Sequence, residues 1–306
     1  MASPSLPSLP SWQQPWPDVT PTDQTALGRA RVLGEALPPL VVQAERIAAT
    51  VMMGNHGLRR AGPGENFWAY RVYAAGDSTQ RIDWHKSAKT EQTFIRDNEW
   101  EAANTLWVWA NLGLRMAFKS HLASETKRHH AQVISLAMAS LALRAHERVG
   151  QLGSGLRASY GRHVLPQLGQ TMSLGNDGAL PKPNALQRRS TALLVSDFLD
   201  EPQTINQALV GLAESGMKGH LVQVTDPAEE TLPYDGRMEF LGLDTALRYR
   251  ANKVAALRED YAKAFLEQRE MVRAAARRVG WTMTVHHTDK PLAATVLALH
   301  NRIGVR

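Results

Sequence analysis

Apolar runs alternate with stretches of helical periodicity along the last two thirds of the chain. Buried strands are predicted by apolar runs at residues 106–111, 191–200, 219–226 and 281–289, and short strands by weaker runs at 156–160 and 239–244. Apolar residues at helical spacing predict helices over 123–149, 203–215, 245–279 and 291–303, whereas the Gly- and Pro-containing segment 161–188 predicts a loop. The alternation predicts an α/β fold in which helices flank a mostly parallel sheet.

The first hundred residues follow a different pattern. Residues 22–53 have helical spacing that is broken at Pro38-Pro39, and Thr22 is placed to cap the first helix. Residues 57–100 carry aromatic segments between glycine turns and predict a β arm with irregular loops. The Pro- and Ser-rich start predicts disorder. We therefore divide the chain into a tail (1–21), the helices and β arm (22–100) and an α/β domain (101–306).

Composition narrows the function classes. The chain has 306 residues and no cysteine, which excludes disulfides, thiolate metal sites and a cysteine nucleophile. Its net charge of +6 comes from scattered basic residues, a pattern that favours a solvated surface over a nucleic-acid site. No apolar run reaches the length of a membrane-spanning helix, and the N-terminus lacks the pattern of a signal peptide. We expect a cytoplasmic protein.

Common catalytic and phosphate-binding motifs are missing from the sequence. There is no Walker motif, no GxSxG nucleophile elbow and no HExxH zinc motif. Residues 153–158 match GxGxxA, but they follow a predicted helix rather than a strand, so a turn is favoured over a dinucleotide site. The histidine pairs at 129–130 and 286–287 are adjacent in sequence, and neighbouring side chains diverge, so neither pair is expected to hold a metal alone.

Polar residues follow the predicted strands at the edge where open α/β sheets bind ligands. The sets are Asn111, Ser196-Asp197, Thr225-Asp226 and Thr288-Asp289. The turn after the first of these strands reads Asn111-Leu-Gly113-Leu-Arg115, which contains no acid and ends in a cation.

The predicted β arm concentrates aromatic, arginine and aspartate residues. Its candidate partner-binding residues are Arg71, Tyr73, Asp77, Asp83 and Trp84. One interpretation is a salt-bridged hairpin with turn glycines, because surface charge pairs are common. The other is a protein-binding surface, for which these residue types are typical.

The ordered motifs of the arm and of the strand ends resemble domain-of-unknown-function family 58, over roughly residues 35–305. They are Gly62-x-Gly64-Glu65-x-Phe67, Arg71-x-Tyr73-x-x-Gly76-Asp77, Ile82-Asp83-Trp84-x-x-Ser87-Ala88, Ser196-Asp197-Phe198-Leu199 and His287-Thr288-Asp289-x-Pro291. The resemblance implies a von Willebrand factor A-like domain. It also implies a partner, a MoxR-type AAA+ ATPase, beside which the protein acts as an adaptor or in chaperone-like assembly on a client protein that the sequence does not name.

Domains of this kind usually end their first strand in Asp-x-Ser-x-Ser, which binds Mg²⁺. Here Asn111, Gly113 and Arg115 stand at the three positions, and Asp197 matches the supporting acid of the neighbouring strand. Because a guanidinium repels a divalent cation, our hypothesis is a metal-free site without a cofactor, in which Arg115 pairs with Asp197. The alternative is that Arg115 points to solvent.

These residues predict a non-enzymatic protein-interaction adaptor. Two alternatives stay open. One is a hydrolase that uses the strand-end acids Asp197, Asp226 and Asp289, although no nucleophile–base pair accompanies them. The other is a module that associates indirectly with a membrane surface for envelope processes.

Overall fold

The computed structural model describes residues 26–55, 67–74, 82–90, 92–98, 104–176, 178–182, 190–244 and 247–303. Its centre is a five-stranded sheet in the order β4-β3-β5-β6-β9, and every neighbouring pair in it is parallel. The strands are β3 (Thr105–Ala110), β4 (Arg148–Gln151), β5 (Ser190–Ser196), β6 (Lys218–Thr225) and β9 (Thr282–His287). The predicted α/β class is confirmed, and a parallel sheet with helices on both faces is the arrangement expected of a von Willebrand factor A-like or Rossmann-like fold.

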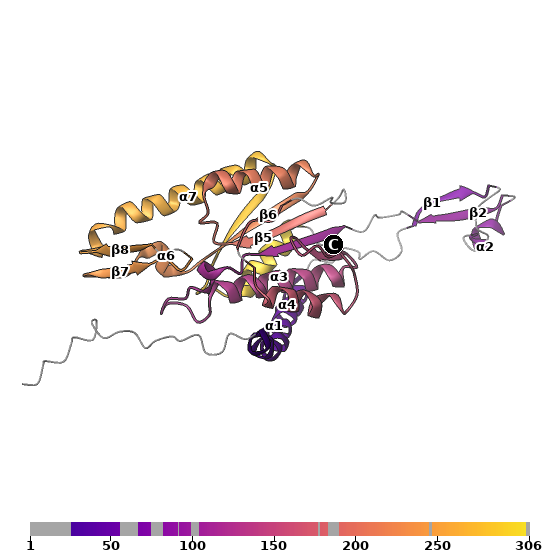
Figure 1. Cartoon of the computed structure of the whole chain (residues 1–306). Helices are drawn as coiled ribbons and strands as arrows, with labels where there is room; N and C mark the ends of the chain where they lie inside the picture. The colour runs from indigo at the N-terminus through magenta and orange to yellow at the C-terminus, as the bar shows by residue number, and fades with distance from the viewer. Residues whose placement is uncertain are drawn as a thin grey trace, which may run out of the picture.

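Helices cover both faces of this sheet (Figure 1). One face carries α1 (Ala26–Asn55), α3 (Lys127–Arg144), α4 (Val164–Ser173) and α8 (Leu292–Ile303). The other carries α5 (Pro202–Glu214) and α7 (Arg258–Arg278). Since each face of the sheet is covered, the central strands β3, β5 and β6 are buried on both sides, which explains their nearly continuous apolar sequences.

The β arm consists of β1 (Phe67–Val72), the short helix α2 (Trp84–Ser87) and β2 (Phe94–Asn98). The two strands pair antiparallel, with a register shift between Phe67 and Ala69. Figure 1 shows the arm standing away from the sheet and its helices. The predicted β character of this region is confirmed for its described residues.

A second hairpin follows α6 (Pro227–Thr231). Its strands are β7 (Met238–Leu241) and β8 (Arg248–Ala251), and they precede a 3-10 turn, η3 (Val254–Ala256). Leu232, Ala251 and Val254 form a small core of their own beneath it. The prediction of one helix over 245–279 is therefore wrong at its start, because residues 248–251 pair with β7 and α7 begins only at Arg258.

Three more helix boundaries differ from the prediction. The predicted break at Pro38-Pro39 is wrong, because α1 runs through both prolines and its second half packs on α3, α4 and α8. The predicted loop at 161–188 contains α4, whose Pro166 lies in the first turn, where proline is tolerated. The helix predicted to reach residue 149 ends at Arg144, followed by His146 at a φ of 59° and by β4.

Two smaller predictions have different outcomes. The predicted strand at 156–160 is reduced to an isolated bridge between Ser159 and Val149. The turn predicted over 153–158 is confirmed by the positive φ of Gly153 and Gly155. The predicted tail and Thr22 lie outside the described residues. Among the helices of the described ranges, none combines the length and apolar character needed to cross a membrane.

Candidate functional site

The carboxyl ends of β3 and β5 bring the predicted residues Asn111, Gly113, Arg115 and Asp197 to one edge of the sheet. β3 ends at Ala110 and β5 at Ser196, and the two strands are direct neighbours. Between the turns that follow them lies a cavity of about 200 Å³. Its lining consists of Asn111, Gly113, Leu114, Arg115, Gly178, Ala179, Asp200 and Asp244.

The side chain of Asn111 links the turn after β3 to the end of β5 through hydrogen bonds. Its Nδ2 donates to the Oγ of Ser196 over 3.1 Å, and its Oδ1 accepts from the backbone N–H of Gly113 over 2.9 Å. A Cβ on Gly178 would lie 2.8 Å from that Oδ1, and Gly178 has a φ of 78°, so the loop that closes over Asn111 requires glycine there. The side-chain carbonyl of Asn111, the one oxygen that this side chain could offer to a metal ion, is thus already hydrogen-bonded.

Arg115 is 25% exposed, and its guanidinium lies within 4.0 Å of three carboxylates. Its Nη2 lies 2.5 Å from Asp200 and its Nε 3.1 Å from Asp244. The expected pair with Asp197 is present but is the longest of the three, at 4.0 Å. Burial alone lowers the pKa of Arg115, but the three carboxylates outweigh burial and the net pKa is raised. The nearest partners of Arg115 are therefore Asp200 and Asp244, while the charge of Asp197 is the first of the effects that raise its pKa.

The closest cation to Asp197 is Lys127. The sequence did not predict Lys127 as a site residue. Lys127 is the first residue of α3 and is 1% exposed. Its Nζ lies 3.1 Å from Asp197 Oδ2 and 2.5 Å from Glu229 Oε1. Burial raises the pKa of Glu229, and the charge of Asp197 adds to this, while Lys127 opposes both. A lysine after a helix-capping threonine carries no sequence signal for such a contact, because its partners lie 70 and 102 residues away.

Asp226, at the end of β6, belongs to a helix cap. Its carboxylate accepts from the N–H of Ala228 over 2.9 Å and from both the N–H and the hydroxyl of Ser120, over 2.9 and 2.5 Å. Glu229 completes a capping box by accepting from the N–H of Asp226 over 3.0 Å. Every oxygen of Asp226 is thus engaged in holding α6 and the loop at Ser120.

The residues at the β3–β5 edge do not fit a hard divalent cation. Such an ion needs several oxygen ligands. Gly113 offers no side chain, Arg115 is cationic, the Asn111 carbonyl is engaged, and the Asp197 carboxylate contacts an ammonium. Across the described ranges, no cluster of three or more His, Asp or Glu side chains is arranged to hold a metal ion.

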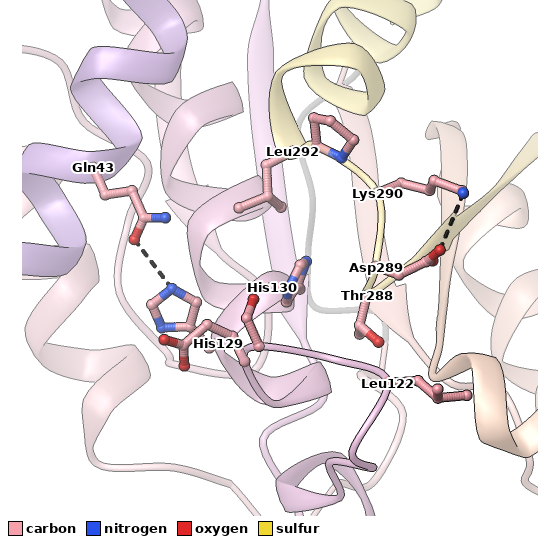
Figure 2. Close-up of a pocket in the computed structure, with 11 residues that line it drawn as sticks. Gln43, Leu122, His129, His130, Thr288, Asp289, Lys290 and Leu292 are labelled. Carbon is pink, nitrogen blue, oxygen red and sulfur yellow. Dashed lines mark hydrogen bonds and ion pairs between the residues drawn. The ribbon is translucent and has the colours of Figure 1, made fainter.

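A larger cavity, of about 450 Å³, lies beside α1, the start of α3 and the loop after β9 (Figure 2). In Figure 2, His129 contacts Gln43 of α1 over 3.0 Å and Asp289 pairs with Lys290 over 3.0 Å. Asp289 thus pairs with Lys290, whereas Asp197 pairs with Lys127 and Asp226 accepts from Ser120 and Ala228. His130 also lines this cavity.

The structure joins one histidine from each sequence pair. His130 Nδ1 lies 2.8 Å from His286 Nε2, and His286 Nδ1 lies 2.7 Å from the Thr295 hydroxyl. Burial, with a smaller effect from neighbouring histidines, lowers the pKa of His130 to about 4 and that of His286 to about 3. Both rings are therefore neutral near pH 7, and they connect α3, β9 and α8.

In the arm, Asp83 and Trp84 have different surroundings. Asp83 caps α2, with its Oδ1 accepting from the N–H of Lys86 over 2.9 Å. Trp84 follows it and is 68% exposed. The backbone N–H of Tyr73 donates to Thr93 over 2.8 Å, which continues the β1–β2 pairing. Asp77 and the side chain of Arg71 lie outside the described residues.

Comparison with known proteins finds relatives without an assigned function. The model of the family described as "Protein of unknown function DUF58" matches residues 69–173 and 175–271. Uncharacterized protein Mb1516 of Mycobacterium bovis and uncharacterized protein Rv1480 of Mycobacterium tuberculosis are each 24% identical over 284 residues, which cover 87% of this chain and 88% of theirs.

Two solved structures resemble part of the chain. An aerotolerance-related membrane protein from Bacteroides fragilis is 12% identical, with a TM-score of 0.37, and the match covers 67% of this chain and 100% of that one. The conserved hypothetical protein BatB from Bacteroides thetaiotaomicron is 10% identical, with a TM-score of 0.37, and the match covers 66% of this chain and 98% of that one.

Proposed function

This chain belongs to the DUF58 family, and we propose that it is a non-enzymatic adaptor that binds a MoxR-type AAA+ ATPase through its β arm and presents a client protein to it. The observation that carries the proposal is Trp84, a large aromatic side chain left 68% exposed on an arm that stands away from the sheet (Figure 1). Exposed aromatic residues on projecting elements are typical anchors of protein interfaces.

The two-stranded sheet of the arm is also expected to be only marginally stable by itself. A two-stranded hairpin is marginally stable in water unless something packs on it. The described strands β1 and β2 pair only with each other. A partner that covers this small sheet would therefore stabilise it, which supports a binding role for the arm.

The strand-end acids support a non-enzymatic role for the sheet edge. Asp197 is neutralised by Lys127, and Asp226 is fully engaged in a cap. Asp289 pairs with Lys290 at the surface. The hydrolase alternative would need at least one of these carboxylates to be free to act as a base, and their contacts favour structural roles instead.

A pull-down from the protein's own cell extract tests the adaptor proposal. The tagged chain is expected to recover an AAA+ ATPase, and Trp84→Ala to lose it. His85→Ala is the matched control, because His85 is the exposed neighbour on the same short helix. The proposal fails if repeated pull-downs, with and without ATP, recover no ATPase, or if the two variants behave alike.

A second candidate function, association with a membrane surface, is favoured by the β7–β8 hairpin. Leu241, Leu243, Leu247 and Tyr249 are all exposed there, with Leu247 at 74%, and Arg248 and Arg250 lie among them. Apolar side chains beside arginines suit an anionic lipid surface. Flotation with anionic liposomes tests this role: binding that is lost in Leu243→Ser/Leu247→Ser supports it, and no flotation of the wild type rejects it.

A further inference from the structure

Two carboxylates, one at the end of β5 and one in the helix that follows β6, need a positive charge. Asp197 is 2% exposed, and Glu229, in the helix that follows β6, is largely buried. Carboxylates taken out of water are costly unless a cation or several hydrogen-bond donors compensate them. The family resemblance implies a divalent ion as the compensation at the acid after this strand. Here the residues of the first strand's turn do not fit such an ion.

We propose that the ammonium of Lys127 is a covalently attached replacement for that divalent cation. It lies 3.1 Å from Asp197 and 2.5 Å from Glu229, within direct contact of both carboxylates. With a side chain only 1% exposed, Lys127 has exchanged its hydration for these two partners. Lys127 thus supplies one positive charge to two carboxylates at this edge of the sheet.

The surroundings hold Lys127 and Asp197 in place from several elements. Thr126 caps α3 by accepting from the N–H of His129, which fixes the first turn that carries Lys127. The Phe118 ring lies 6.0 Å from the ammonium. The backbone carbonyl of Asp197 accepts from Gln223 over 3.0 Å, and Gln223 in turn accepts from Arg269 over 2.8 Å.

Arg115 does not fill the same role. It is 4.0 Å from Asp197 and has two nearer carboxylates of its own. Its side chain is 25% exposed, so water shares in its solvation. The positive charge that was expected from Arg115 is therefore supplied to Asp197 mainly by Lys127.

This inference concerns the same sheet edge as the proposed adaptor function, but its test needs no partner, so the two fail separately. If Lys127 stands in for a cation, removing its amine leaves the carboxylates of Asp197 and Glu229 without their shared ammonium. An added hard cation is then expected to bind and to stabilise the fold.

The experiment is thermal unfolding of the full chain with and without millimolar MnCl₂. Wild type is expected to show no change in Tm on adding Mn²⁺. Lys127→Ala is expected to have a lower Tm than wild type. Adding Mn²⁺ is expected to raise the Tm of this variant by about 5 °C or more. Lys290→Ala, which removes a surface ammonium paired with the Asp289 carboxylate, is the control and is expected to show no such rise. Stabilisation of the wild type by Mn²⁺ that is lost in Asp197→Asn would overturn the proposal, and so would a folded Lys127→Ala that does not respond to Mn²⁺.

A double variant covers the case in which Lys127→Ala does not fold. Lys127→Met and Asp197→Asn are combined, which removes both charges of the pair. If the double variant is more stable than Lys127→Met alone, the charges are coupled as proposed. A double variant that is no more stable than Lys127→Met would contradict the pairing and the proposal with it.

Discussion

His130 and His286 form a direct hydrogen bond between the start of α3 and the last strand of the sheet, with 2.8 Å between Nδ1 and Nε2. The bond needs one proton between the two nitrogens, so one ring donates and the other accepts. Protonating both rings would place two donors face to face inside the core. The lowered pKa values of both histidines agree with this geometry.

The first prediction is a loss of stability in mild acid. The folded pKa values, about 4 and about 3, lie below the ordinary value of 6.5. As the pH falls through 6.5, the unfolded chain takes up protons that the native chain refuses, so the free energy of unfolding falls. Between pH 7.5 and 5.5 the loss is about 1 kcal/mol for each histidine, and it continues until the folded pKa is reached.

Urea unfolding at the two pH values measures this effect. His286→Gln is expected to reduce the difference between pH 7.5 and 5.5 by about 1 kcal/mol. His121→Gln, at an exposed position, is the control and is expected to leave the difference unchanged. An unaltered pH dependence in His286→Gln would show that this pair does not control acid sensitivity.

The second prediction concerns Gly219 at the start of β6. A Cβ at this position would overlap the ring of Trp281, which is buried and donates from Nε1 to the Met217 carbonyl over 3.1 Å. Gly219→Ala is therefore expected to destabilise the fold by about 1–3 kcal/mol. Chemical denaturation measures the change. The exposed neighbour Lys218 provides the control, since Lys218→Ala is expected to stay within about 0.5 kcal/mol of wild type.

The third prediction separates the two strand-end acids Asp226 and Asp289. Asp226→Ala leaves the N–H groups of Ser120 and Ala228 without their acceptor, and a loss of about 2–4 kcal/mol is expected. Asp289→Ala removes a surface ion pair with Lys290 and is expected to cost less than about 1 kcal/mol. Equal losses in the two variants, measured by urea unfolding, would contradict the structural role assigned to Asp226.

The fourth prediction concerns the order of the arm. Asp83 accepts from the N–H of Lys86, and the nearby hydroxyl of Ser87 accepts from the N–H of Phe94, so the cap of α2 is connected to β2. Asp83→Ala is expected to speed amide exchange across residues 82–98 and to leave the sheet unchanged. Hydrogen–deuterium exchange with mass spectrometry measures both regions. Faster exchange in β5 or β6 would show that the arm and the sheet are coupled.

The sequence predicted four of the five strands of the sheet, because buried parallel strands have nearly continuous apolar sequences, but it missed β4, whose first residues fell in a predicted helix. Residues 191–196 and 219–225 are examples, and their covering helices follow from helical spacing. The ends of the helices were predicted less accurately, because they depend on contacts with residues that are distant in the sequence. Residues 248–251 have no strong strand pattern of their own and become a strand by pairing with β7.

The candidate site was predictable only in part. Asn111, Gly113, Arg115 and Asp197 could be placed together because the carboxyl ends of neighbouring parallel strands share an edge. Lys127 could not, since its contact with Asp197 joins a helix start to a strand end 70 residues away. The hydrogen bond between His130 and His286 joins residues 156 positions apart, and nothing in the sequence around either histidine pair predicted the contact.

The packing of α1 has a practical consequence for fragment design. The match to the family model begins at residue 69, yet Leu40, Ala44, Ala48 and Val51 of α1 lie in the same core as α3. A fragment cut at the start of the family match would leave the apolar surfaces of α3, α4 and α8 open to water, and such a patch promotes aggregation. The boundary at which the recognisable family begins is therefore later than the boundary at which a stable protein begins.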